Sequence, residues 1–242
     1  MLTENEKLRF AELCSENAEL HTLYEKFMDT HRYAISRIAH EIRNPVTLIN
    51  SFLQLYEQEH PEAASSVNWL HAQENMKALR HLLADLSEYN NAHTLHLEMV
   101  NLYRLLSAMA SDAASGLCPS SVSLVLKKDS AIPSILEDVG KMRQVFLNLI
   151  QNAVEAMPNG GTLTISIESD GDSITIHFTD TGCGIEPEQL SSIFDPFVTH
   201  KRNGTGLGLA VSKEIISAHH GSISAESVPG KGTDFTIRLP VH

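Results

Sequence analysis

Apolar residues recur at every third or fourth position through the first part of the chain. The spacing persists from about residue 4 to residue 56 with no Gly and a single Pro, and its apolar positions include Leu13, Leu20, Leu23, Phe27, Ile35, Ile38, Ile42, Ile49, Leu53 and Tyr56. After a break at residues 59–62, a second run carries Leu70, Leu79, Leu82, Leu83, Leu86 and Tyr89 and ends near residues 90–91. Two consecutive runs of helical periodicity predict a helical hairpin.

A hairpin of two helices leaves part of each apolar stripe in water. Two hairpins from two chains can cover these stripes by forming a four-helix bundle, so we expect a homodimer. The alternative is a hairpin that packs on the rest of its own chain. We assign residues 1–30 to an N-terminal helical lead or coiled coil and residues 31–93 to the hairpin.

The rhythm changes to mixed helix and strand after residue 94. Segments 162–168 and 173–180 alternate polar with apolar residues, and the Asp170-Gly171 pair between them is typical of a hairpin turn. We expect further strands at 95–99, 121–126, 222–227 and 233–239, and helices at 100–114, 138–157, 186–194 and 207–220. The predicted fold class is therefore α+β, in which residues 94–242 form an antiparallel-rich sheet with helices on one face.

The charge balance argues against two classes of partner. The chain has 18 basic and 30 acidic residues, a net charge of −12, and no run of Lys and Arg, so we expect no nucleic-acid or membrane contact. No stretch approaches ~18 consecutive apolar residues, and the first residues lack the order of a secretory signal. The three cysteines, Cys14, Cys118 and Cys183, lie far apart and suggest neither a disulfide framework nor a zinc site. We expect a cytoplasmic protein.

His40 stands out among the histidines by its position on the first helix. On a helical wheel the apolar residues near it fall within about 80° of one another, while His40 points roughly 140–170° away from their centre. Asn44 lies on the same outward face, four residues on. A packed core histidine is therefore disfavoured, although an exposed histidine without a function remains the alternative.

The residues that follow His40 add chemistry to it. Glu41 is adjacent, and a carboxylate close to an imidazole can hold the proton of one ring nitrogen and leave the other free to attack. Pro45 removes a hydrogen bond to the carbonyl of Glu41 and predicts a kink or soft point just after His40. The alternative for Glu41 is an ordinary solvated charge.

The predicted helix 138–157 carries amides on one face. Gln144, Asn148 and Asn152 are spaced four apart in an otherwise apolar stretch, and Glu155 follows them. Buried amides need partners, which a Mg²⁺ ion with bridging phosphates would supply. The alternative is a helix cap or an amide pair between helices.

Two glycine-containing turns complete the candidate chemistry. Asp180-Thr181-Gly182-Cys183-Gly184 follows a strand, where glycines allow close approach to a flat ring and the carboxylate can accept a hydrogen bond from an exocyclic amine. By itself this could be a plain turn. The run 203–209, Asn-Gly-Thr-Gly-Leu-Gly-Leu, precedes a helix and suits an anionic phosphate chain, but it is neither a Walker loop nor a dinucleotide fingerprint.

The run His40-Glu41-Ile42-Arg43-Asn44-Pro45 resembles the phosphoacceptor motif of the sensor histidine kinases of two-component systems. Val46 stands where that family usually has Leu. The asparagine helix, the turn after Asp180, the segment 194–197, the glycine loop and the segment 230–235 follow in the order of that family's catalytic and ATP-binding domain. The resemblance covers the chain from about residue 31 to its end and implies a Bergerat-type α/β sandwich over residues 94–242.

The resemblance also implies roles for individual residues. His40 would be the phosphoacceptor, Glu41 its acid–base partner, and Asn44 the residue that orients water in kinases able to dephosphorylate their partner. ATP and Mg²⁺ would be the cofactors, with Mg²⁺ on Asn152. The expected ATP contacts are Asn148 and Glu155 beside the metal, Asp180, Gly182, Gly184 and Thr233 at the adenine, and Lys201, Gly204, Thr205, Gly206, Leu207 and Gly208 over the phosphates. Residues 198–203 would form a short lid over the nucleotide, in which His200 departs from the Thr common in kinases with a lid of similar length. Phe197 could be a plain core aromatic, or it could dock either this lid or the hairpin.

The sequence therefore predicts a protein-histidine kinase. It would phosphorylate its own His40 with ATP and transfer the phosphoryl group to an aspartate of a response regulator receiver domain, and Asn44 could support the reverse reaction. One alternative is a conformational ATPase or serine kinase of the same ATP fold, although Asn148 stands where gyrase-like enzymes need a glutamate. Another is a phosphotransfer dimer that no longer uses ATP.

Overall fold

A computed structural model describes residues 9, 17–116, 118–119, 121–129, 131–199, 201 and 204–241. The chain divides into two compact units at residue 90, one spanning 1–90 and the other 91–242. Half of the predicted lead, together with His200 and Asn203, lies outside the described residues. The predicted hairpin ends at residue 93, three residues after this boundary.

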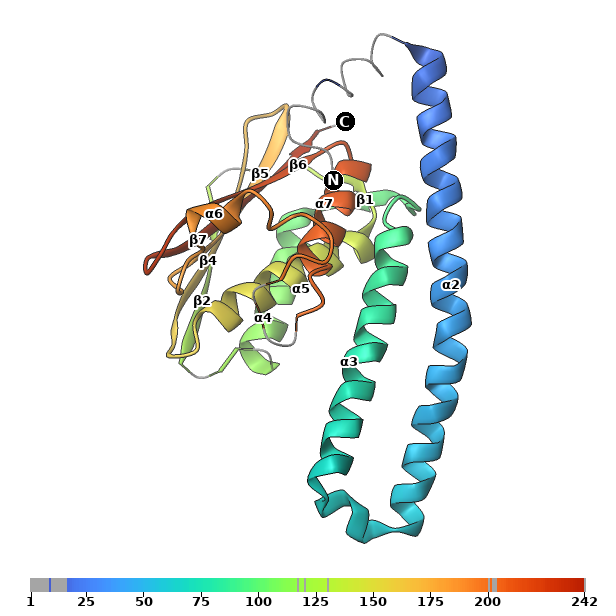
Figure 1. The fold of residues 1–242 in the computed structure, drawn as a ribbon. Helices are drawn as coiled ribbons and strands as arrows, with labels where there is room; N and C mark the ends of the chain where they lie inside the picture. The colour runs from blue at the N-terminus through green and yellow to red at the C-terminus, as the bar shows by residue number, and fades with distance from the viewer. Residues whose placement is uncertain are drawn as a thin grey trace. The chain divides into compact units, whose positions relative to one another are not determined.

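The first unit is the predicted helical hairpin (Figure 1). Helix α2 spans Ala18–Glu59, the 3₁₀ turn η1 spans Pro61–Ser65 and helix α3 spans Val67–Asn90. The side chain of Asn17 caps α2 by accepting hydrogen bonds from two backbone N–H groups of its first turn. The helix continues through Pro45 and ends before Pro61, where the proline starts η1.

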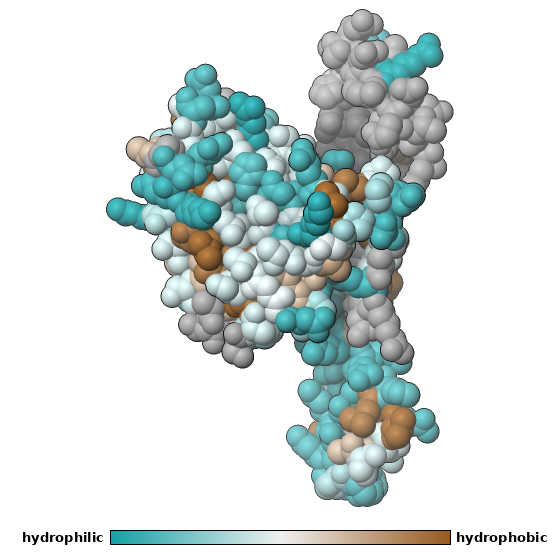
Figure 2. All heavy atoms as spheres, turned by 90° about the vertical axis from the view of Figure 1, so that its left-hand side faces the viewer, coloured by the Kyte–Doolittle hydropathy of each residue, from teal (hydrophilic) through white to brown (hydrophobic). Residues whose placement is uncertain are grey.

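The hairpin has a small core of its own. Ala39 and Val46 of α2 pack with Leu83 of α3, and Met76 and Leu86 lie partly buried beside them. Other apolar positions of the hairpin stay exposed, among them Leu23, Phe27, Ile38, Ile42, Leu48, Ile49, Phe52, Leu55, Val67 and Leu70. Figure 2 shows apolar surface among polar residues near the tip of the hairpin. Two helices thus leave part of the apolar stripe in water, as the sequence predicts.

The second unit contains a five-stranded sheet in the order β2-β4-β5-β7-β6. These strands span Val122–Lys128, Gly161–Ser169, Ser173–Asp180, Gly232–Pro240 and Ser222–Val228 in that order. Only β2 and β4 run parallel, since the other neighbours are antiparallel. A two-stranded antiparallel sheet joins β1, Glu98–Val100, to β3, Ile135–Glu137.

Helices cover one face of the large sheet (Figure 1). They are α4, Leu102–Gly116, α5, Val139–Ala156, and α7, Gly208–Ala218, while the short α6 spans Pro187–Leu190. The core lies between these layers, where Phe146 of α5 meets Phe178 of β5 with ring centroids 5.7 Å apart. The predicted α+β architecture with helices on one face is confirmed.

Two expectations about elements were wrong in detail, and one strand was missed. The strand expected at 95–99 forms at 98–100, and its partner β3 was not predicted. Both strands are three residues long and are fixed by their mutual pairing, which local alternation cannot reveal. The helix expected at 186–194 ends at Leu190, because the backbone then turns through bonds such as Ser192 N–H to Gln189 O at 3.0 Å.

Candidate functional site

His40 lies on the solvent-exposed side of α2, and Asn44 is exposed one turn further on. The exposure predicted from the wheel is confirmed. Glu41 is also exposed, and its Oε1 accepts a hydrogen bond from Nε of Arg37 at 3.0 Å. Arg37 was missed as a partner, although a basic residue four positions before an acid on a helix was a readable signal.

Arg43, within the predicted phosphoacceptor motif, joins α2 to α3. Its Nη2 donates to the carbonyl of Leu83 at 3.3 Å and to the hydroxyl of Ser87. These bonds cross the hairpin one turn from His40. The motif residue without an assigned role thus fixes the local register of the two helices.

The amide face of α5 forms the centre of the second unit's candidate site. The sequence suggested that Asn148 and Asn152 are buried, but both are only half-buried, and Glu155 is exposed. Asn148 Nδ2 donates to Ser212 Oγ at 2.9 Å, and Ser212 donates to the carbonyl of Gly208 at 3.0 Å. Asn148 therefore links α5 to α7, and its partner Ser212 was not predicted.

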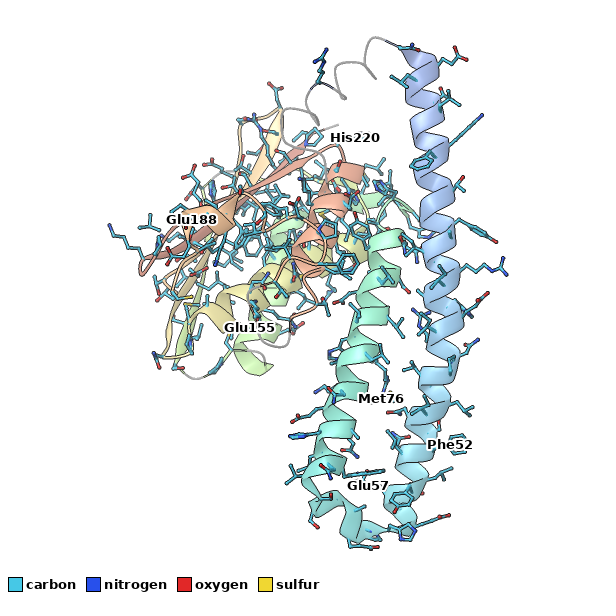
Figure 3. All side chains as sticks on the ribbon, in the orientation of Figure 1. Phe52, Glu57, Met76, Glu155, Glu188 and His220 are labelled. Atoms are coloured by element: carbon cyan, nitrogen blue, oxygen red, sulfur yellow. The ribbon has the colours of Figure 1, made fainter. Side chains whose placement is uncertain are left out.

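Lys201 reaches the same face of α5. Its Nζ donates to Oδ1 of Asn152 at 2.6 Å and also to Oε2 of Glu155. Figure 3 shows Glu155 on α5 beside the loop that leads to α7. The structure thus brings together three residues that the sequence had assigned to the metal and phosphates.

Asp180 closes the other end of the site at the end of β5. It is only 3% exposed, and its Oδ1 accepts hydrogen bonds from the backbone N–H of Gly182 at 2.7 Å and of Thr233 at 3.3 Å. Among the described residues, Oδ2 has no hydrogen-bond partner. Burial raises the pKa of Asp180 above its usual value, against the effect of these two bonds. The arrangement leaves one carboxylate oxygen to read a ligand donor.

Ser227, which the sequence did not single out, organises the surroundings of Thr233. Its Oγ accepts from the backbone N–H of Ile185 at 2.8 Å and donates to the carbonyl of Gly232 at 2.9 Å. Because its proton is used in this way, Thr233 Oγ1 at 3.0 Å donates to it. A hollow of about 200 Å³ lies here, lined by Asp180, Thr233 and their neighbours on β5, β6 and β7.

Close packing at three glycines joins these parts. Gly184 has φ 71°, a conformation that favours glycine, and a Cβ there would collide with the carbonyl of Val228. A Cβ on Gly208 would lie 2.5 Å from Oδ1 of Asn148. Gly182 packs on Ala156, so the turn after Asp180 contacts the end of α5. The predicted motifs thus surround one helix.

The remaining residues expected at the phosphates lie just before α7. Gly204, Thr205 and Gly206 precede the buried Leu207, at which α7 is capped. The backbone N–H of Phe197 donates to the carbonyl of Gly206 at 2.9 Å. Phe197 has φ 66° and is 62% exposed, so its ring is not packed in the core formed by the described residues of the second unit.

A buried polar cluster supports the start of α5. Asp138 caps this helix through Oδ1 and Lys141 N–H at 2.9 Å, and its Oδ2 accepts from the backbone N–H of His96 at 2.8 Å. Burial raises the pKa of Asp138, but hydrogen bonds from the backbone N–H groups of His96, Lys141 and Gly140 outweigh it and lower the pKa below its usual value. The carboxylate is therefore held in its charged form.

Glu137 and His219 lie beside Asp138, with Oε2 of Glu137 3.3 Å from Nε2 of His219. At this distance they could form an ion pair, but the surrounding bonds favour the neutral form of both side chains. His219 Nδ1 lies 2.7 Å from the carbonyl of Ile215 and must donate, so Nε2 carries a lone pair that accepts from the backbone N–H of Asp138 at 3.1 Å. Burial lowers the pKa of His219 and raises the pKa of Glu137 to about 8. A protonated Glu137 is compatible with that lone pair, whereas a carboxylate would be repelled.

The donor set on α5 fits a hard cation. No group of three or more His, Cys, Asp or Glu suited to a metal occurs in the described part of the chain. Mg²⁺ bound to a nucleotide, however, needs few protein oxygens because phosphates and water supply the rest. Asn152 Oδ1 and the Glu155 carboxylate already hold one cation, the Lys201 ammonium, so they would suit such an ion.

Comparisons with known proteins agree with this geometry. Residues 137–242 match the family described as histidine kinase-, DNA gyrase B- and HSP90-like ATPase. The chain is 40% identical over 205 residues to sporulation kinase A of Bacillus subtilis, covering 84% of this chain and 33% of that protein. It is 34% identical over 206 residues to sensor histidine kinase ZraS of Salmonella typhi, covering 84% of this chain and 44% of that protein.

A solved structure shows the same relationship. Full-length ShkA in complex with AMPPNP has a TM-score of 0.70 and 25% identity, covering 86% of this chain and 45% of that one. No helix in the described ranges is both long enough and apolar enough to cross a membrane.

The second unit is thus an ATPase domain of the histidine kinase, gyrase B and HSP90 type. Because the similarity to the curated kinases extends through the hairpin, the chain belongs to the sensor histidine kinases. The chain spans less than half the length of the two curated relatives named above.

Proposed function

We propose that this chain is the kinase core of a two-component system and that it transfers the γ-phosphoryl group of ATP to His40. The observation that carries the proposal is the exposure of His40 and Asn44 on the hairpin, in a chain whose other unit is an ATPase domain. An exposed imidazole is accessible to a phosphoryl donor, whereas a packed one would not be. The reaction would take place in the cytoplasm.

In this proposal the second unit binds and orients ATP. Asp180 Oδ2 accepts from the exocyclic amine of adenine, with Thr233 and the turn of Gly182 and Gly184 beside the ring. Lys201 and the backbone from Gly204 to Gly208 hold the phosphates at the start of α7, where free N–H groups favour anions. Mg²⁺, held by Asn152 and Glu155, would neutralise charge that develops on the phosphates.

The transfer itself uses His40 as a nucleophile. By family analogy Nε2 attacks the γ-phosphorus, the bond to the β–γ bridging oxygen breaks, and ADP leaves with that electron pair. Glu41 would hold the proton on the opposite ring nitrogen, which requires it to exchange its bond with Arg37. Positioning and charge neutralisation supply most of the rate.

We further propose that two hairpins form a homodimeric four-helix bundle. Ile38 is 54% exposed and Ile49 is 48% exposed on α2, and such apolar residues are stable when a second copy covers them. The face around His40 would remain open to a response regulator, whose aspartate takes the phosphoryl group. Asn44 would orient water when the same kinase dephosphorylates that regulator.

Incubation of the full chain with γ-labelled ATP and Mg²⁺ tests this function. The expected result is an acid-labile, base-stable phosphoryl label that His40→Gln abolishes while nucleotide binding stays unchanged. His220→Gln is the matched control, because His220 is also exposed and lies at the end of α7, away from the candidate site (Figure 3). Label that persists in His40→Gln would refute the proposal.

The rival ATPase function receives no support from the site. A gyrase-like ATPase needs a general base to activate water where Asn148 stands, and an amide cannot accept that proton. Asn148 instead donates to Ser212. The site therefore favours transfer to an amino-acid acceptor over hydrolysis.

A further inference from the structure

The contact between Lys201 and α5 places a positive charge where a divalent cation is expected. Nζ of Lys201 donates to Oδ1 of Asn152 at 2.6 Å and to Oε2 of Glu155. These oxygens are the ones that would face Mg²⁺ in the proposed function. One amide oxygen and one carboxylate oxygen therefore hold an ammonium group in place of a metal.

The backbone around Lys201 supports this position. The N–H of Lys201 donates to Oγ1 of Thr199 at 3.2 Å, and the N–H of Gly204 donates to the carbonyl of Lys201 at 3.3 Å. A Cβ at Gly204 would lie 2.5 Å from Oγ1 of Thr199, so the turn is tight on the side of Thr199. Lys201 is thus presented to α5 by its own turn.

We propose that Lys201 is a built-in occupant of the cation site, whose ammonium group stays on Asn152 and Glu155 of α5 until a divalent cation displaces it. Asn152 and Glu155 cannot bind the ammonium and a metal ion with the same oxygens at the same time. When Mg²⁺ enters, Lys201 is released and becomes available to the phosphates. This exchange rests on the proposed function for its biological meaning, since ATP would bring the metal.

The strength of the contact suits an exchange. The side chains of Lys201 and Glu155 are 47% and 59% exposed, so solvent screens their attraction. Exposed ion pairs contribute at most about 1 kcal/mol, which corresponds to a roughly fivefold preference for the bound arrangement. Such a contact keeps the Lys201 ammonium on α5 but yields to a doubly charged ion.

The reactivity of the lysine amine tests the exchange without nucleotide. The full chain is treated briefly with an acylating reagent, and modification of Lys201 is measured by mass spectrometry relative to the exposed Lys127. We expect millimolar Mg²⁺ to speed modification of Lys201 by about two- to fivefold, with NaCl matching the ionic strength in its absence. Lys127 should not respond.

Two variants identify the site of the effect. Glu155→Gln should speed modification of Lys201 by a similar factor and remove most of its response to Mg²⁺. Glu188→Gln, on α6 and exposed like Glu155, is the matched control and should behave as the wild type (Figure 3). Both positions are exposed, so thermal unfolding of the variants should match that of the wild type.

Each other outcome overturns the exchange. If Lys201 reacts at the same rate with and without Mg²⁺, the metal does not displace it. If Mg²⁺ speeds the reaction equally in Glu155→Gln, the metal acts elsewhere. A separate titration of the wild type with ATP tests the proposed function, so a chain that fails to bind ATP but shows the Mg²⁺ response would refute the function and keep the exchange.

Discussion

The two units of this chain bury their apolar residues to very different degrees. The core of the hairpin consists of Ala39, Val46 and Leu83, while many of its larger apolar side chains are exposed. The second unit buries Phe146, Phe178 and the inward sides of β4, β5 and β7 between sheet and helices. The difference indicates that the second unit can fold from its own contacts, whereas the hairpin leaves exposed the apolar side chains that the proposed second copy would cover.

The largest expected effect comes from the core of the second unit. Phe146→Ala should lower its free energy of unfolding by about 3–5 kcal/mol, because it removes a fully buried ring and leaves a cavity. Urea unfolding followed by the fluorescence of the single Trp, Trp69 in the hairpin, and by circular dichroism can separate the units. If the Trp69 transition moved as far as the other, the two units would not be independent.

A smaller effect is expected on the exposed stripe of the hairpin. Ile49→Glu places a charge at a position that is exposed in one chain but buried in the proposed dimer. The dissociation constant of the dimer should therefore rise by at least about tenfold. Light scattering over a range of concentrations measures the mass. Gln54→Glu adds the same charge at an exposed polar position and should leave the dimer intact. A mass unchanged in Ile49→Glu would show that another surface joins the chains.

The smallest expected effect is the change with pH in the free energy of unfolding of the second unit. Folding raises the pKa of Glu137 from 4.5 to about 8, so the native state holds a proton that the unfolded state has lost. Stability from this group is therefore lost as pH rises towards 8. Below about pH 6.5 the lowered pKa of His219 acts in the opposite direction, since the unfolded imidazole then binds the extra proton.

The pH window of 6.5 to 8 isolates Glu137. Stability of the wild type should fall there by about 1 kcal/mol per pH unit, and Glu137→Gln, which keeps a donor for His219, should flatten the curve. Urea unfolding at four pH values measures it, with Glu188→Gln as the control. Parallel curves for wild type and Glu137→Gln would mean that Glu137 is ionised in the native state.

Local periodicity was enough to predict the hairpin, and alternation together with Asp170-Gly171 was enough for β4 and β5. The exposure of His40 also followed from the wheel. Side chains that act through distant partners could not be found in this way. Ser212 contacts Asn148 from 64 residues away, and Ser227 acts through Ile185 from 42 residues away.

The candidate site shows the same limit. Its motifs were readable because each has a local spacing, but the contact of Lys201 with Asn152 and Glu155 joins segments 46 to 49 residues apart. The sequence identified all three residues and gave them separate tasks. Only the folded arrangement places the ammonium group of Lys201 on the oxygens of Asn152 and Glu155.

The two carboxylate oxygens of Asp138 connect two parts of the second unit that are far apart in the sequence. One holds the first turn of α5, and the other holds the backbone of His96, in the segment by which the chain enters this unit from the hairpin. The position of that segment is therefore tied directly to the first turn of the helix that carries Asn148 and Asn152. The side chain of Asp138 therefore couples the position of the segment around His96 to that of α5.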